Sequence, residues 1–242
     1  MSALYEIEHL SKQYENGVLA VNDLTLSVDA GEVFCMLGAN GAGKTTTLMV
    51  SLGFTGPTRG AVRINGFDIV RQPLEAKQHV AYVSENVQLY GHFTALQNAR
   101  FFAELSGRKD VNDALLDRVL VRVGLAREAH RRRVRGFSKG MRQRLGIAIA
   151  ILREAKVILL DEPTSCLDPK GGLDFLQLLK ELRDEQRAIF MTTHDIFRTR
   201  EIANCVGIMV QGRLVRTLGS DEIKTADLAA IYTHYIDQVG EA

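Results

Sequence analysis

Residues 32–48 read EVFCMLGANGAGKTTTL, an apolar run followed by a glycine-rich loop and a helical pattern. Within this stretch, residues 38–45 are Gly-Ala-Asn-Gly-Ala-Gly-Lys-Thr, a complete G-x-x-x-x-G-K-[ST] pattern. The run 32–37 predicts a buried strand and residues 45–52 predict a helix, so the loop has the strand–loop–helix context that this pattern requires. Glycines allow successive backbone N–H groups to converge on an anion, and the helix start adds unpaired amides beneath it. The sequence therefore predicts that this loop binds the phosphates of a nucleoside triphosphate.

Each position of the loop has an expected role toward the triphosphate. Lys44 is placed to reach the β- and γ-phosphates, and the hydroxyl of Thr45 is placed to ligate Mg²⁺. The alternative is a glycine-rich turn with an accidental Lys-Thr, which the flanking elements disfavour. The residues expected to contact the nucleotide are Gly38, Ala39, Asn40, Gly41, Ala42, Gly43, Lys44, Thr45 and Thr46.

The bulk composition is that of an ordinary globular protein. The 242 residues are 46% hydrophobic and 24% charged, which gives enough material for a sizeable core. A net charge of +1 gives no argument for nucleic acid or an acidic membrane surface as a partner. Cys35, Cys166 and Cys205 are isolated and odd in number, so they indicate neither a disulfide framework nor a metal site. This cysteine usage favours a reducing, cytosolic compartment.

No segment reads as a signal peptide or a membrane span. The first residues lack the basic start and the apolar stretch of a signal peptide. The longest apolar runs, residues 146–152 and 157–160, are far shorter than the roughly 20 residues that a transmembrane helix needs. We therefore expect any work on a membrane to be done through another chain.

Strand patterns dominate the first part of the chain and alternate with helical patterns afterwards. Apolar residues recur at helical spacing from Thr94 to Leu152, with Thr94 as the expected cap, and a further helix is expected from about 168 to 186. Strands that alternate with helices indicate an α/β protein with a mostly parallel sheet covered on both faces. The expected strands are residues 5–9, 24–28, 32–37, 61–64, 80–84, 156–160 and 188–192, with a hairpin of 205–210 and 213–217.

Two acidic residues end the apolar run that begins at residue 157. Val157–Leu160 leads into Asp161 and Glu162 at the carboxyl end of a strand, where open α/β sheets bind ligands. We expect Asp161 to hold Mg²⁺ and Glu162 to orient and polarise the attacking water, while Lys44 and backbone amides counter the phosphoryl charge. The alternative is an ordinary surface pair of acids, which the glycine loop upstream disfavours.

A second exposed helix start follows residues 137–141, Phe-Ser-Lys-Gly-Met, which precede Arg-Gln-Arg-Leu and a helix expected from Gly140 to Leu152. With the motifs above, this segment resembles the signature of the ATP-binding subunit of an ABC transporter, most often Leu-Ser-Gly-Gly-Gln. The resemblance runs from about residue 4 to 219, with the motifs in the family's order. It implies a P-loop NTPase fold with an N-terminal antiparallel β subdomain and an inserted α-helical subdomain. It also implies that Ser138, Lys139 and Gly140 complete the ATP site of a second subunit, so that two copies hold two nucleotides head to tail.

Three shorter matches belong to the same resemblance. Residues 165–168, Ser-Cys-Leu-Asp, are similar to the family's D-loop, and we interpret Cys166 there as packing. His194 is similar to the switch histidine, which contacts the γ-phosphate and supports Glu162; a helix-capping role is the alternative. Tyr14 stands where the family stacks an aromatic ring on adenine, with a strand-edge aromatic as the alternative. The expected catalytic residues are Lys44, Glu162 and His194.

Three positions depart from the commonest family pattern. Glu85 stands in a loop where Gln is usual, and its carboxylate either offers oxygen to Mg²⁺ or stays solvated and contributes little. Lys139 either carries positive charge toward a phosphate across the dimer or points to water. Met141 cannot make the amide contacts of the usual Gln. A Glu-containing loop together with Ser-Lys-Gly-Met is similar to the exporter-like, ABC-2 type branch of the family.

The leading functional hypothesis is an ATPase subunit that powers a separate transmembrane permease. The resemblance implies docking of the permease around Glu85–Phe93, a second ATPase subunit as partner, and a place at the cytoplasmic face of the membrane. We expect one ATPase domain over residues 1–219, with a helical subdomain inserted at about 87–153, and a short helical tail over 220–242.

The alternative is a soluble ABC-type ATPase acting on nucleic acid or ribosomes. Residues 127–144 are rich in arginine, but no aromatic ladder accompanies them and the net charge is near zero, so we expect no nucleic acid partner. A small-molecule kinase or a GTPase is a third class. The chain lacks the Asn-Lys-x-Asp motif that reads guanine, and a kinase has no need of a Ser-Lys-Gly-Met signature.

Overall fold

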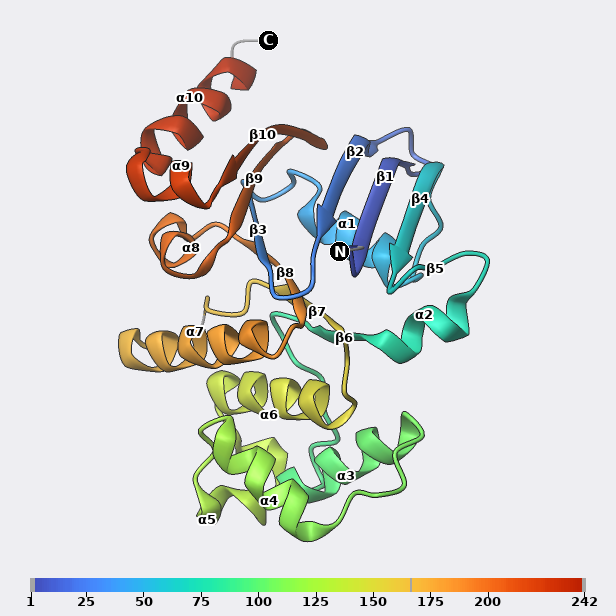
Figure 1. The fold of residues 1–242 in the computed structure, drawn as a ribbon, viewed down its shortest axis with the longest axis vertical. Helices are drawn as coiled ribbons and strands as arrows, with labels where there is room; N and C mark the ends of the chain where they lie inside the picture. Colours follow the sequence, from blue (N-terminus) through green and yellow to red (C-terminus); the bar gives the residue numbers. More distant parts are fainter. Residues whose placement is uncertain (1–2, 166, 241–242) are drawn as a thin grey trace.

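The computed structural model describes residues 3–165 and 167–240, and they form two sheets with helices around them (Figure 1). The smaller sheet has four strands in the order β2-β1-β4-β5. Its three long strands pair antiparallel, as expected for the N-terminal β subdomain. The strands are β1 (Tyr5–Gln13), β2 (Leu19–Val28), β4 (Arg59–Ile64) and β5 (Phe67–Asp68).

The larger sheet has six strands in the order β10-β9-β3-β8-β7-β6. Neighbouring strands are parallel from β9 to β6, and only the β10–β9 pair is antiparallel. Every residue of β3 and β7 is buried, as their continuous apolar runs predict for strands covered on both faces. The predicted mostly parallel sheet is therefore confirmed. The strands are β3 (Val33–Leu37), β6 (Val80–Val83), β7 (Val157–Asp161), β8 (Ala188–Thr193), β9 (Cys205–Val210) and β10 (Arg213–Gly219).

The side chains of β3 alternate between two separate cores because successive residues of a strand point to opposite faces. Phe34 and Met36 join the core beneath the four-stranded sheet, whereas Val33, Cys35 and Leu37 join the core on the helical side. In the first core, the ring of Phe34 stacks on that of Phe190 with centroids 5.7 Å apart. Burying such a ring contributes about 1.5–3 kcal/mol, so both cores hold β3, and the loop that follows it, in place.

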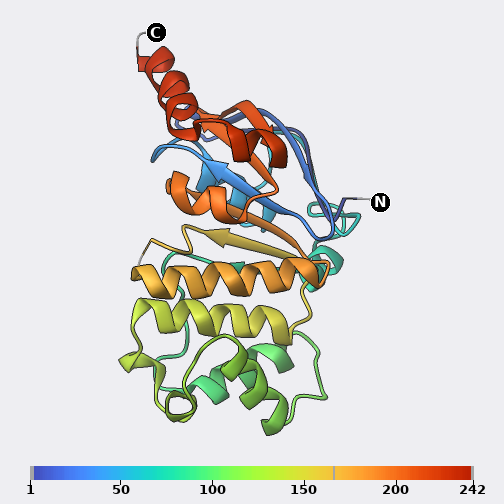
Figure 2. The ribbon, with the colours of Figure 1, turned by 60° about the vertical axis from the view of Figure 1, so that its left-hand side comes forward.

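Helices lie in layers beneath the larger sheet (Figure 2). Helix α7 (Pro169–Asp184) covers the sheet. Helix α6 (Lys139–Leu152) runs alongside α7 and also meets the edge strand β6. The segment between β6 and β7 also contains α3 (Ala95–Leu105), α4 (Asp113–Arg122), the short α5 (Arg127–His130) and the 3₁₀ turn Val134–Gly136. These helices form the lowest part of the molecule in Figure 1.

Two local features explain how this helical segment is built. Thr94 caps α3 as predicted: its hydroxyl accepts from the backbone N–H of Gln97, and the Gln97 side chain accepts from the N–H of Thr94. Gly146 lets the middle of α6 approach β6 closely, because an added Cβ would lie 3.1 Å from Cγ1 of Val83. Helix α6 is therefore held against the sheet at its centre.

The structure also differs from the sequence prediction in several elements. Helices α2 (Pro73–His79) and α8 (Ile196–Ile202) were not predicted, and β1 and β2 are longer than expected. Helix α6 begins at Lys139 rather than at Gly140, because Ser138 provides its cap. After β10, α9 (Ser220–Thr225) and α10 (Leu228–Gly240) form the described part of the tail. Among the described helices, none is long and apolar enough to cross a membrane.

Candidate functional site

A cavity of about 230 Å³ lies where the loop after β3 faces the carboxyl end of β7. Its position agrees with the rule that open α/β sheets bind ligands beyond the carboxyl ends of their strands. The glycine loop and the two acids, which are more than a hundred residues apart in sequence, meet here. The residues that line it are Ala20, Ala39, Asn40, Gly41, Gly43, Lys44, Thr45, Thr46, Glu85, Asp161 and Glu162. Gly38 and Ala42 also belong to the loop, but they are buried and do not line the cavity.

Contacts from two other elements fix the shape of the glycine loop. Gly43 has a φ of +107°, and a Cβ there would collide with the carbonyl oxygen of Ala20, so only glycine fits. From the β9–β10 turn, the N–H of Gly212 donates to the carbonyl of Ala42 at 2.8 Å. The backbone amides of the loop are thus held in place before any ligand arrives.

Lys44, the first residue of α1 (Lys44–Ser51), is folded back onto the loop. Its ammonium donates to the carbonyls of Gly38 at 2.6 Å and Ala39 at 3.2 Å. It also lies 3.7 Å from Oε1 of Glu162, and the side chain is nearly buried. A buried ammonium at the floor of the cavity is the strongest positive charge available there to an anion.

Asp161 is the most tightly held acid of the site. Its Oδ1 accepts from the hydroxyl of Thr192 at 2.6 Å, and its Oδ2 accepts from the hydroxyls of Thr45 and Tyr82, each at 3.5 Å. Burial, and then the charge of Asp161, raise the pKa of Tyr82 above its usual range, so the phenol stays protonated and donates. The carboxylate is oriented toward Thr45, so two oxygen atoms of the kind that a hard cation binds lie side by side.

Glu162 lies between two positively charged or chargeable groups. Its Oε2 is 2.9 Å from Nδ1 of His194, and its Oε1 is 3.7 Å from Nζ of Lys44. The side chain is 15% exposed, and no hydrogen-bond partner of Oε1 occurs within the described part of the chain. The residue adopts a φ of +46°, held by an N–H bond to the carbonyl of Thr192. One carboxylate oxygen thus lies against His194, and the other is available to a ligand in the cavity.

Tyr14 lies at the rim of the cavity, although it is not part of the lining. Its hydroxyl is 3.4 Å from that of Thr46, which does line the cavity, and its side chain is partly exposed. The ammonium of Lys12 lies 5.2 Å from the centre of the ring. One face of this ring at the rim suits stacking against a planar base.

The residues of the expected signature lie outside the cavity lining. Ser138 caps α6 by accepting from the N–H of Met141 at 3.2 Å, and a Cβ added at Gly140 would lie 2.8 Å from the side chain of Leu167. Lys139 reaches back toward the cavity, because its Nζ lies 3.5 Å from Oε1 of Glu85. The expected packing role of Cys166 lies outside the described residues.

Four residues of the site were missed by the sequence analysis. Thr192 pairs with Asp161 in the β7–β8 register, and Tyr82 stands on the neighbouring strand β6, so both depend on strand order. Ala20 lies at the start of β2 and meets the loop across the two sheets. Gln143, in α6, donates to the carbonyls of Ser84 and Glu85. The adjacent strand ends are the only sequence signal that could have suggested Thr192 and Tyr82.

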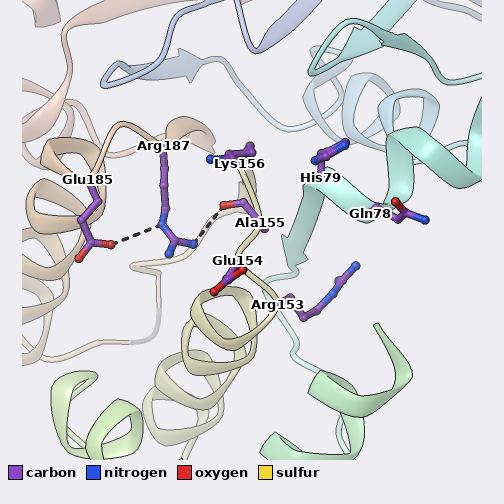
Figure 3. Close-up of a pocket in the computed structure, with 8 residues that line it drawn as sticks. All are labelled: Gln78, His79, Arg153, Glu154, Ala155, Lys156, Glu185 and Arg187. Atoms are coloured by element: carbon purple, nitrogen blue, oxygen red, sulfur yellow. Dashed lines mark hydrogen bonds and ion pairs between the residues drawn. The ribbon is translucent and has the colours of Figure 1, made fainter. Parts of the chain in front are cut away.

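A larger cavity, of about 470 Å³, lies at the opposite ends of the strands (Figure 3). Three helices end there: α2 at His79, α6 at Leu152 and α7 at Asp184. Arg153 donates to the carbonyl of Lys77, and Arg187 donates to the carbonyl of Ala155, each at 3.1 Å. These cations balance the negative ends of the helices, so the charge of this cavity has a structural explanation.

Comparisons with known proteins show the family to which the chain belongs. The family model described as ABC transporter matches residues 21–165. The ABC transporter ATP-binding protein NatA of Bacillus subtilis is 36% identical over 201 residues, which are 82% of this chain and 81% of that protein. The bacitracin transport ATP-binding protein BcrA of Bacillus licheniformis is 34% identical over 225 residues, 93% of this chain and 72% of that protein.

Solved structures of ABC ATP-binding chains have the same fold as this chain. The structure of an ATP-binding subunit of an ABC transporter has a TM-score of 0.85 and 29% identity, covering 96% of this chain and 98% of that chain. A dimeric ATP-binding cassette in a post-hydrolysis state with ADP and Pi has a TM-score of 0.81 and 24% identity, covering 89% and 98%, which supports the fold. The family match, the relatives and the fold together lead to one conclusion: the chain belongs to the ABC transporter family, as an ATP-binding subunit that hydrolyses ATP.

Proposed function

We propose that this chain hydrolyses Mg·ATP as a dimer and thereby powers a separate transmembrane permease, in the direction of export. The observation that carries the proposal is Glu162, held by His194 and facing the same cavity as Lys44 and Asp161. The names of relatives give bacitracin transport for one and carnitine transport for another, so export rests on the Glu85 loop and the Ser-Lys-Gly-Met signature. The relatives favour this function over a soluble ATPase that acts on nucleic acid or ribosomes.

Binding of the triphosphate falls to the glycine loop and Lys44. The loop amides and the start of α1 meet the β- and γ-phosphates, while Lys44 turns from its carbonyl partners toward the phosphate oxygens. Tyr14 stacks on the adenine at the rim. The contacts to the phosphates are charge-assisted hydrogen bonds, and the contact to the adenine is apolar stacking.

The oxygen atoms of Thr45 and Asp161 fit a magnesium ion. Mg²⁺ prefers one or two protein oxygens completed by water and phosphate, and these two side chains lie 3.5 Å apart at the cavity wall. When bound, the ion neutralises charge on the β- and γ-phosphates. Thr192 and Tyr82 keep the Asp161 carboxylate aimed at that place.

Proton transfer from the attacking water falls to Glu162. Its Oε1 has no hydrogen-bond partner within the described residues, so it can accept a proton from a water placed in line with the γ-phosphate. His194, 62% exposed at the edge of the cavity, contacts Oε2 through Nδ1, and we assign its Nε2 to the γ-phosphate. We assign Lys44, Glu162 and His194 as the catalytic residues.

Coupling to transport requires two copies of the chain. Ser138, Lys139 and Gly140 lie at the exposed start of α6, outside their own cavity lining, and would complete the cavity of a second copy. ATP can drive closure only if it binds the closed dimer more tightly than the open form, and hydrolysis removes that preference.

An aromatic surface on the helical segment suits the permease. Tyr90, Phe93, Phe101 and Phe102 have ring centroids 5.0–6.2 Å apart, and a shallow apolar groove of about 280 Å³ lies beside them. Tyr90 is 50% exposed and Phe93 is 36% exposed. Exposed aromatic clusters of this kind mark interaction sites on soluble chains, and this one directly follows the Glu85 loop.

A photo-crosslinking residue in place of Tyr90 or Phe93 is expected to attach the chain to an integral membrane protein in native membranes. The same replacement at Leu74, a more exposed apolar residue on α2, serves as the control. The measurement is mass spectrometry of the cross-linked species. Cross-links to the same membrane protein from Leu74 but not from Tyr90 would contradict this docking surface.

Thr192→Val is expected to raise the Mg²⁺ concentration that half-saturates ATP hydrolysis by about tenfold, since residues that orient a metal ligand typically contribute this much. The substitution keeps the shape of the side chain but removes the hydroxyl that donates to Asp161 at 2.6 Å. ATP hydrolysis is measured against Mg²⁺ at fixed ATP, with Thr217→Val on the exposed strand β10 as the control. An unchanged Mg²⁺ requirement would show that Thr192 does not orient Asp161.

A further inference from the structure

Two of the residues that depart from the commonest family pattern are in contact with each other. Glu85 and Lys139 are separated by 54 residues in sequence, and Nζ of Lys139 lies 3.5 Å from Oε1 of Glu85. Both side chains are a little under half exposed, at 45% and 43%. Each departure adds a charge where the commoner pattern has none, and here the two charges are opposite.

Glu85 belongs to the cavity that binds the triphosphate. The lining contains three carboxylates, those of Glu85, Asp161 and Glu162, and one ammonium, that of Lys44. Asp161 is engaged by hydroxyl groups, and Glu162 by His194 and Lys44. The charge of Glu85 is the one that no group of the lining balances, and it faces the place where a polyanion binds.

The backbone of the Glu85 loop is fixed to the same helix that carries Lys139. The side-chain amide of Gln143 donates to the carbonyl of Ser84 at 2.9 Å and to that of Glu85 at 3.0 Å, and Gln143 is buried. Positions 139 and 143 are four residues apart on α6 and so lie on one face of the helix. Gln143 holds the loop at the distance from α6 at which the side chain of Lys139 can reach Glu85.

We propose that Lys139 is a positioning residue that acts within its own chain, as the counter-ion that keeps the carboxylate of Glu85 from opposing the triphosphate. Without Lys139, the carboxylate is free to turn into the cavity, where it repels the phosphates and competes for Lys44 and Mg²⁺. This role in the monomer is separate from the part that Lys139 plays at the cavity of a second copy when the dimer closes. The inference rests on the proposed function insofar as the cavity must bind Mg·ATP.

The test is a double-mutant cycle on Mg·ATP binding, with Lys139→Gln, Glu85→Gln and the two combined. Binding of a fluorescent ATP analogue is measured at a protein concentration low enough to keep the chain monomeric. Lys139→Gln is expected to weaken binding about three- to fivefold when residue 85 is Glu, a size suited to a solvent-exposed ion pair. In the Glu85→Gln background, the same substitution is expected to weaken binding less than twofold. Lys139→Arg, which keeps the charge, is expected to bind within twofold of the unaltered chain.

The salt dependence of binding is the control that makes the outcome specific. In 0.5 M salt the effect of Lys139→Gln is expected to shrink, because the Debye length falls to a few ångströms. An equal loss in both backgrounds would mean that Lys139 acts independently of Glu85, and no loss at all would mean that the pair is inert; either result overturns the inference. Failure of the unaltered chain to bind Mg·ATP would instead refute the proposed function. The two failures are therefore distinguishable.

Discussion

Glu162→Gln is expected to lower the rate of ATP hydrolysis about 10²–10⁴-fold while Mg·ATP remains bound, since general-base catalysis contributes this much. The amide keeps the size of the side chain but cannot accept the proton of the attacking water at the position of Oε1. Loss of the negative charge also removes repulsion toward the γ-phosphate, so nucleotide affinity is not expected to fall. Phosphate release and bound nucleotide are measured on the same preparation.

The same variant tests the dimer. Because ATP is retained and not cleaved, Glu162→Gln is expected to accumulate as a dimer with Mg·ATP, as seen by light scattering after size-exclusion chromatography. Glu75→Gln, an equivalent change on exposed helix α2, is the matched control. Undiminished hydrolysis by Glu162→Gln would remove this residue from the catalytic role. A strictly monomeric variant with bound ATP would instead remove the dimer from the mechanism.

Lys44→Ala is expected to weaken Mg·ATP binding at least about 10–100-fold, which corresponds to the roughly 1.5–3 kcal/mol of a hydrogen bond to a charged group. Lys44 is the only cation in the lining of the cavity, and its side chain is nearly buried, so no neighbouring cation of that lining replaces it. Isothermal titration calorimetry with ATP and Mg²⁺ measures the effect.

A matched control separates binding from folding in this experiment. Lys109→Ala removes an exposed lysine of the loop between α3 and α4 and should leave the affinity unaltered. The thermal midpoint of Lys44→Ala shows whether the loop survives the loss of the bonds to Gly38 and Ala39. A folded Lys44→Ala that binds Mg·ATP normally would contradict the assignment of the glycine loop.

Local chemistry allowed much of the fold and the position of the loop to be predicted from sequence. The strand–loop–helix unit around Lys44 has a fixed spacing, and the burial of β3 follows from its apolar run. The acids at 161 and 162 follow a run of the same kind, so their place at a strand end was predictable. These features need no knowledge of which strand neighbours which.

The two missed helices leave a weak signal in sequence because they bury little. In α2 only Ala76 is buried, and Leu74 is 73% exposed. In α8 the buried residues are Thr199 and Ile202, while Phe197 is 83% exposed. A short helix without an apolar stripe has no helical period to detect, and tertiary contacts decide its conformation.

The missed site residues depend on contacts between distant segments. Thr192 meets Asp161 only because β7 and β8 are neighbours in parallel register. The contact of Lys139 with Glu85 depends on how α6 lies against β6, which no local pattern encodes. These two departures lie 54 residues apart in sequence, and their proximity is visible only in the fold.

Helix α6 touches the larger sheet near its midpoint. Its 14 residues give a rigid rod about 21 Å long. Gly146 rests against Val83 near the midpoint, Lys139 stands at one tip, and Arg153 follows the other. Because a rigid helix moves as one body, a displacement at the Arg153 end is carried to Lys139 at the other end.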